Sequence, residues 1–239
     1  MDTWYSISGF GDPMSSLSHL VGVVIFFVLS IFLIISASSK RAPRGSVLFA
    51  LQFSFATLFL LSMSFVYHMQ GVGTTARAVM LRLDVAAIFV LIASTFTAIH
   101  GFVFTGWRRW GMIGTLWTIA AVGISLRTVF FDSIPSIIGD GIFLLMGWLG
   151  AFSTWMLWKK YRWAAAGPVI TGGLCYTIGA IINAAGKMVV IDRVWGPHET
   201  FHLFVLAGIG CHWAFVWSLS DGSFQRRHSN ILEGSETEA

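Results

Sequence analysis

The feature that most constrains this chain is a succession of apolar runs, each long enough to cross a lipid bilayer. The hydrocarbon layer is about 30 Å thick and takes about 20 helical residues to cross. Of the 239 residues, 56% are hydrophobic and only 11% are charged, whereas a soluble domain is about a quarter charged. The sequence therefore predicts an all-α integral membrane protein, a bundle of seven transmembrane helices. We expect the spans at about 14–38, 46–69, 83–105, 111–131, 137–158, 164–188 and 197–220.

The segments between these runs carry the charges, prolines and aromatic residues that end membrane spans. We expect residues 71–82 to form a loop and residues 107–110, Trp-Arg-Arg-Trp, to form a boundary before the fourth span. Residues 1–220 are predicted to form a single domain. The polar tail at 221–239 is predicted to be disordered, because it has too little apolar surface to bury.

Lysine and arginine are unevenly distributed between the two sides of the predicted bundle. Five lie on the side of the N-terminus and ten on the other side, and the positive-inside rule places the richer side in the cytoplasm. We therefore expect the N-terminus outside the cytoplasm and the C-terminus inside it. The richer group comprises Lys40, Arg41, Arg44, Arg108, Arg109, Lys159, Lys160, Arg162, Arg226 and Arg227, and the smaller group comprises Arg77, Arg82, Arg127, Lys187 and Arg193.

The net charge of +4 does not indicate a nucleic-acid partner. The cations form short clusters beside the spans, where anionic lipid headgroups explain them better. We expect membrane lipids as partners and no nucleic acid. Cys175 and Cys211 both fall inside predicted spans, so a disulfide framework is not expected.

Two histidines, His198 and His202, lie four residues apart at the start of the last run. Residues i and i+4 share one face of a helix, so both imidazoles can hold one metal ion. Histidine is rare within spans unless it faces the bundle interior and functions there. This pair therefore predicts a metal site inside the membrane-embedded bundle.

Further polar residues fall in the same half of the predicted bundle when the spans alternate in direction. Ser64 and His68 lie near the end of the second span, and Asp84 opens the third. Ser15, Ser18, His19 and Asn183 also fall there. Three imidazoles and a water molecule are a familiar coordination set for zinc. This sorting into one half favours a shared site with His68 as a third candidate ligand.

Each of these residues also has a simpler interpretation. His68 and His19 could lie at the membrane interface as ordinary residues near a span end. Asp84 could form only an interfacial ion pair with Arg82. Ser64 could donate to the carbonyl four residues earlier in its own helix, as serine in a span commonly does. Spacing alone does not choose between these interpretations and the shared site.

Other histidines are interpreted differently. We interpret His212, which lies deeper in the last span, and His100, which lies near the opposite face, as structural residues. Glu199 neighbours the histidine pair but points about 100° away from His198 around the helix. It is therefore not an expected metal ligand.

Three segments of the chain, residues 64–68, 83–93 and 198–208, resemble the hemolysin III family. That bacterial family belongs with the progestin and adipoQ receptors, and more distantly with the alkaline ceramidases, in one superfamily of seven-span proteins. The resemblance extends from Ser18 to His212 and includes residues 146–148 and 172–176. It implies a protein of the bacterial inner membrane.

The resemblance also implies a site. A zinc ion would be held by His68, His198 and His202, with Ser64 and Asp84 close to the water on the metal. Three positions depart from the family's pattern, and none of them is a proposed ligand. They are Val85, where histidine is frequent, Ser94, where glycine is usual, and Ala98, where proline is common.

A mechanism follows from these parts. Zinc on three neutral imidazoles activates water at neutral pH, Asp84 could act as acid and base, and Ser64 could stabilise an oxyanion. The sequence thus predicts hydrolysis of an amide or ester in a lipid, and the resemblance points to ceramide-like amides and membrane lipid homeostasis. Two alternatives stay open: a non-enzymatic lipid receptor or sensor with a structural zinc, and a pore-forming, hemolytic protein.

Overall fold

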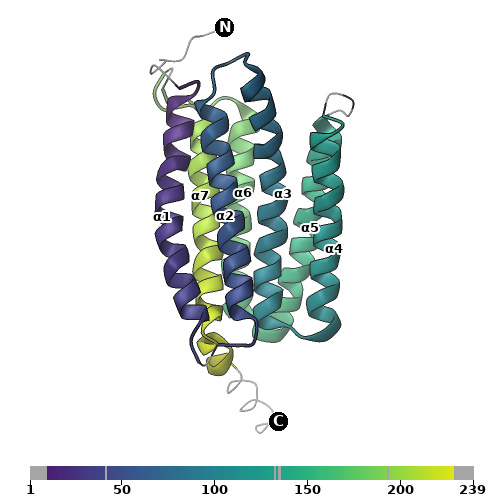
Figure 1. Ribbon diagram of the computed structural model, residues 1–239. Helices are drawn as coiled ribbons and strands as arrows, with labels where there is room; N and C mark the ends of the chain where they lie inside the picture. The colour runs from purple at the N-terminus through teal and green to yellow at the C-terminus, as the bar shows by residue number, and fades with distance from the viewer. Residues whose placement is uncertain (1–9, 41, 132, 134–135, 193, 229–239) are drawn as a thin grey trace.

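The computed structural model describes residues 10–40, 42–131, 133, 136–192 and 194–228 (Figure 1). The long helices in these ranges stand side by side as a bundle, and the only strand-like pairing there is one isolated bridge between Ile191 and Trp195. The prediction of an all-α membrane protein is confirmed. The helices are α1 (Pro13–Ala37), α2 (Ser46–Met69), α3 (Thr75–Val103), α4 (Gly106–Thr128), α5 (Ser136–Tyr161), α6 (Trp163–Ala185) and α7 (Pro197–Ser220).

Five of these helices, α1, α2, α3, α6 and α7, are long and apolar enough to cross a membrane. The other two have 23 and 26 residues, which at 1.5 Å per residue reach about 34 Å or more and so match the bilayer in length. Helix α4 is less apolar because Arg108 and Arg109 lie in its first turn. The assignment of α4 and α5 as spans stays a prediction.

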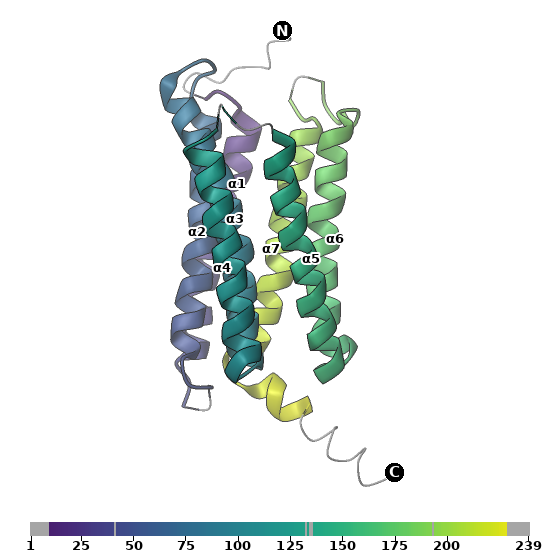
Figure 2. The same cartoon turned by 90° about the vertical axis from the view of Figure 1, so that its right-hand side faces the viewer.

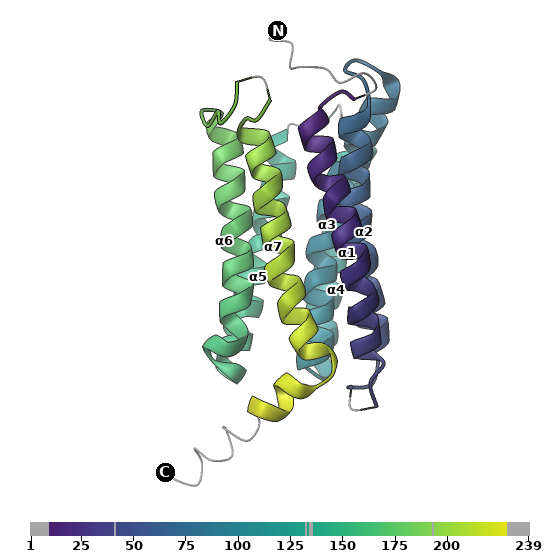
Figure 3. The ribbon, with the colours of Figure 1, turned by 90° about the vertical axis from the view of Figure 1, so that its left-hand side faces the viewer.

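Helices α3 and α7 form the centre of the bundle. Each helix packs against the next one along the chain, and α7 closes the bundle against α1, α2 and α3 (Figures 1 and 3). Residues 93–103 of α3 are all buried. The N-terminal ends of α1, α3, α5 and α7 therefore lie at one end of the bundle, together with the C-terminal ends of α2, α4 and α6.

Helix α1 has its apolar surface outside and its polar residues inside. This is the reverse of a soluble helix and is what a bilayer selects, because lipid solvates apolar side chains and a buried polar group needs a protein partner. Its inward residues include Ser15, Ser16, His19 and Ser30, and its exposed large side chains are Leu17, Val21, Val24, Ile25, Phe27, Val28, Ile31, Phe32 and Ile35.

Two of the expected boundaries are wrong because charged residues do not end a helix. Residues 75–82, expected in a loop, form the first two turns of α3, whose start is capped by the Thr74 hydroxyl accepting from the Arg77 N–H at 3.2 Å. Residues 107–110, expected as a boundary, belong to α4, which begins at Gly106. Arginine is a good helix former, so both helices continue past the apolar run.

Helix α6 ends earlier than we expected, and the tail after α7 contains a helix that we did not expect. Helix α6 ends at Ala185 and not near residue 188, because Gly186 adopts φ 65° and closes the helix.

After α7, residues 223–228 form a short helix, in a tail that we expected to be disordered. Phe224 is buried against the rings of Phe215 and Tyr161, which gives this segment an apolar anchor. Residues 229–239 lie outside the described part.

The antiparallel arrangement places the described members of the two cation groups at opposite ends of the bundle, and the richer group lies at the end where α7 finishes (Figure 1). Because lysine and arginine are retained in the cytoplasm, we predict that a reporter fused after Ala239 is active only there. A tag at the N-terminus should be accessible only from the other side. A C-terminal reporter that works only outside the cytoplasm would reverse the orientation.

Candidate metal centre

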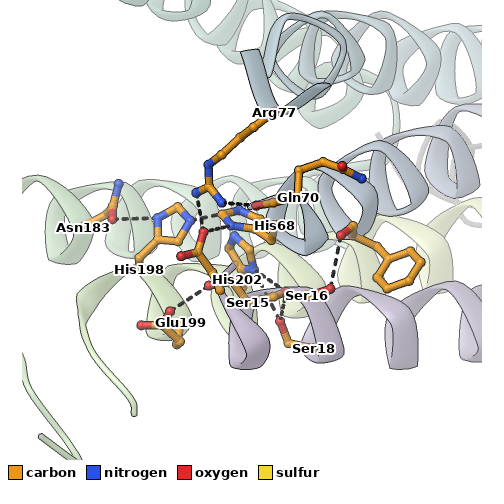
Figure 4. A network of polar contacts seen from close by, with 12 residues as sticks. Ser15, Ser16, Ser18, His68, Gln70, Arg77, Asn183, His198, Glu199 and His202 are labelled. Atoms are coloured by element: carbon orange, nitrogen blue, oxygen red, sulfur yellow. Dashed lines mark hydrogen bonds and ion pairs between the residues drawn. The ribbon is translucent and has the colours of Figure 1, made fainter. Parts of the chain in front are cut away.

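Three histidines from two helices converge at the N-terminal end of the bundle. His68 is the next-to-last residue of α2, and His198 and His202 lie in the first two turns of α7. One ring nitrogen from each of the three lies within 4.8 Å of the others. Figure 4 shows the rings turned toward one another. The structure therefore brings together all three residues that the sequence suggested as ligands.

In each of the three rings, Nδ1 lies against an oxygen that can only accept a hydrogen bond, so each Nδ1 donates. The contacts are His68 to Asp12 Oδ2 at 2.9 Å, His198 to Asn183 Oδ1 at 3.2 Å, and His202 to the carbonyl oxygen of Ser15 at 3.2 Å. A neutral imidazole has one N–H. When the three rings are neutral, as metal ligands must be, their Nε2 atoms therefore carry the lone pairs.

Two lone pairs that face each other repel, and a metal ion between them would bind both. His68 Nε2 and His198 Nε2 are 3.2 Å apart, a separation at which two acceptors repel each other. Two Zn–N bonds of 2.0–2.1 Å at a tetrahedral angle would place the nitrogens about 3.3 Å apart. The donor atoms and their spacing thus fit a zinc ion held by Nε2 of His68, His198 and His202.

Asp12, which sequence reasoning did not select, connects this centre to the N-terminal segment. Its Oδ2 accepts from His68 and from Arg77 at 2.5 Å. Its backbone N–H donates to the carbonyl of His68 at 2.8 Å, and that of Gly11 donates to Met69 at 3.2 Å. These bonds satisfy carbonyls that the end of α2 would leave unpaired. The only local signal for Asp12 was an acidic residue directly before Pro13, at the start of a helix.

The charge of Asp12 is fixed by its two partners. Burial by itself raises the pKa of this carboxyl group, but the hydrogen bonds from His68 and Arg77 and the charge of Arg77 outweigh it and lower the pKa to about 2. Asp12 is therefore ionised at any physiological pH and keeps His68 Nδ1 as a donor. A carboxylate behind a ligating histidine orients the ring and makes it a better ligand.

Glu199 holds α1 and α7 together beside the centre. Its Oε1 accepts from Ser15 Oγ at 2.7 Å, and its Oε2 accepts from the Gly196 N–H at 2.9 Å. Because Ser15 also accepts from His202 through its carbonyl, one serine positions both the capping acid and a candidate ligand (Figure 4). Glu199 is buried. One of its oxygens caps the first turn of α7, and the other binds α1.

His19 lies against the centre without being part of it. Its side chain is 3% exposed, and its ring stacks on His202 with 3.9 Å between the centroids. Neither of its nitrogens has a hydrogen-bond partner among the described residues. A buried polar group without a partner is unfavourable, so His19 is available to a water molecule or to a polar group of a ligand.

Asp84 and Ser64 form a pair next to the histidines. The Ser64 hydroxyl hydrogen-bonds to the Asp84 side chain between α2 and α3, and Asp84 also lies near His68. Neither residue belongs to the group of three ligands, and Ser64 is buried. Their contact runs between helices, which favours the shared site over a serine bonded only to its own helix.

His100 and His212 have structural partners. His100 Nδ1 lies 2.9 Å from the carbonyl oxygen of Arg108, and its Nε2 lies 2.6 Å from Ser153 Oγ. His212 Nε2 lies 3.3 Å from the carbonyl oxygen of Val169. Both are away from the three converging histidines, as the structural interpretation requires.

Comparison with known proteins identifies the family of this chain. The family model described as haemolysin-III related matches residues 11–213. The chain belongs to this family. It is 26% identical over 197 residues to "Hemolysin-3" of Bacillus cereus, covering 81% of this chain and 84% of that protein. It is also 26% identical over 194 residues to "Hemolysin-3 homolog" of Bacillus subtilis (strain 168), covering 81% and 87%. The matched region contains Asp12 as well as all three histidines.

We predict about one zinc ion per chain and a strong loss of zinc in the His198→Ala protein, because two imidazoles from the remaining set cannot complete the site. Zinc content of the purified protein measures this directly. His228→Ala, which changes a histidine in the tail helix, is the control and should keep its zinc. Full zinc retention in His198→Ala would refute the assignment.

Replacement of Asp12 by asparagine should weaken zinc binding without abolishing it. The amide keeps the shape of the carboxylate but loses the charge that orients His68, and such partners typically contribute 10–100-fold in metal affinity. Competition with a zinc chelator measures the affinity. Asp221→Asn, which changes an acid at the opposite end of the bundle, should have the affinity of the unmodified protein. Equal affinities for all three proteins would exclude the role of Asp12.

Proposed function

We propose that the protein is a zinc-dependent hydrolase that cleaves an amide or ester bond in a membrane lipid, with ceramide-like acyl amides as the favoured substrates. The observation that carries this proposal is the set of three Nε2 lone pairs beside the Ser64–Asp84 pair, inside a bundle of apolar helices. Resemblance to a superfamily that includes ceramidases supports the substrate class. The role in the cell would be membrane lipid homeostasis.

The roles of the residues follow from their positions. His68, His198 and His202 would hold the zinc ion, which supplies Lewis acidity and makes water nucleophilic at neutral pH. Asp84 would take a proton from the attacking water and deliver it to the leaving amine. The Ser64 hydroxyl would exchange its bond to Asp84 for one to the substrate's carbonyl oxygen as that oxygen gains charge.

The depth of the site suits a lipid linkage. His202 is the sixth residue of α7 and His68 is one residue from the end of α2, so the centre lies within about 10 Å of the helix ends. An amide or ester next to a lipid headgroup lies at a similar depth, just inside the interface. A water-soluble substrate would gain nothing from such a position.

A second function, a lipid receptor or sensor with a structural zinc, is favoured by one observation. His68, His202 and Ser64 are all less than 5% exposed, and the Asp12 bonds tie the N-terminal segment over the end of α2. A substrate would have to displace part of this cover. Turnover of a lipid by the purified protein separates the two functions.

We predict that Asp84→Asn retains its zinc but loses hydrolysis of a fluorescent ceramide in mixed micelles, because an amide cannot accept the proton. Ser64→Ala should be slower by about 10²-fold, as is typical for one lost oxyanion donor. Ser54→Ala, which changes another buried serine of α2, is the matched control. Full activity of Asp84→Asn would exclude the acid and base role. No turnover of any acyl amide or ester by zinc-loaded protein would favour the receptor.

A further inference from the structure

A large cavity lies between α4 and α5, at the end of the bundle opposite the histidines. Its volume is about 800 Å³, within the range of ligand-binding sites. Both helices face the viewer in Figure 2. Met112, Leu149 and Met156 line its interior. Neither the metal centre nor the proposed hydrolysis uses this cavity.

The mouth of the cavity is cationic. Arg108 from α4 and Lys159 and Lys160 from α5 line it, and among the described side chains no carboxylate does. Lys160 is held in place, because its Nζ donates to the carbonyl oxygen of Val103 at 2.6 Å and lies over the ring of Phe104. Arg108 and Lys159 are exposed. Two of the three cations thus have their charged groups available to a ligand.

The start of α4 adds to the positive potential at this mouth. Arg108 lies in the first turn, and the side chain of Thr105 at the N-cap accepts no hydrogen bond from the helix. The first N–H groups of a helix have no partners within it and carry the positive end of the helix dipole. An anion at this end of the cavity would interact with side chains and with the helix terminus together.

The cavity extends from this cationic mouth along the helices into apolar surroundings. From Lys160 to Leu149 the lining of α5 covers a stretch of twelve residues, about 16 Å along the bundle axis. Trp107, Phe152 and Trp155 on its rim are more than half exposed, as are residues that contact lipid in a membrane protein. A ligand that matches this shape has an anionic group at the interface and an apolar chain directed into the bilayer.

We propose that this cavity binds an anionic phospholipid from the leaflet at the C-terminal end of the bundle. The phosphate lies against Arg108 and Lys159, and an acyl chain lies between Leu149 and Met156. A free phosphate ion would leave the apolar part of the cavity unfilled. Basic pockets between membrane helices are known sites for anionic lipid headgroups. The bound lipid joins α4 to α5.

Titration of the purified full-length protein with phosphatidylglycerol, followed by native mass spectrometry, tests this proposal. Phosphatidylglycerol should bind with saturation, whereas phosphatidylcholine, which has no net charge, should not. The double variant Arg108→Gln/Lys159→Gln should bind phosphatidylglycerol about 30-fold more weakly, at about fivefold for each cation removed. Lys40→Gln/Arg226→Gln removes two cations at the same end but outside the cavity and should bind as the unmodified protein does.

Three outcomes would overturn the proposal. The first is equal binding by the two double variants, since the cavity would then contribute nothing. The second is displacement of the lipid by millimolar inorganic phosphate, which would make the site one for the free ion. The third is binding that is seen only after removal of residues 229–239, which contain Glu233, Glu236 and Glu238, since the acidic tail would then be the occupant.

Discussion

The organisation of this protein depends on one electrostatic constraint, the convergence of three imidazole lone pairs in an apolar bundle. Each Nε2 faces the others because each Nδ1 is committed to an oxygen on another part of the chain. Those oxygens come from the segment before α1, from the end of α6 and from the first turn of α1. The hydrogen bonds that prepare the site therefore also fix how α1, α2, α6 and α7 pack at this end.

The two ends of the bundle have different chemistry. The end with the histidines presents neutral imidazoles and acids that are already paired, as Asp12 is with Arg77 and Glu199 is with Ser15. The other end presents cations and aromatic rings around an elongated cavity. A lipid bound between α4 and α5 would strengthen the contact of these helices without touching the metal centre. The proposed hydrolysis and the proposed lipid binding would then vary independently.

Most of the fold could be predicted because length and hydropathy alone determine which runs can cross a bilayer. The starts of α3 and α4 could not be predicted in this way, because the residues that extend them, such as Arg77 and Arg108, are good helix formers outside the apolar run. The helix at 223–228 depends on Phe224 finding rings of α5 and α7. That contact joins distant parts of the sequence and has no local signal.

The sequence by itself determined the bundle of long apolar helices, the pairing of His198 with His202 on one face, and the half of the bundle in which His68, Asp84 and Ser64 lie. Only the tertiary structure decided that one ring nitrogen from each of the three histidines converges, that Asp12 orients His68, and that His19 lies beside the site without a hydrogen-bond partner among the described residues. The physical reason is that helical periodicity fixes the directions of side chains on one helix. Contacts between helices depend on packing angles and hydrogen bonds that span up to 187 residues of sequence.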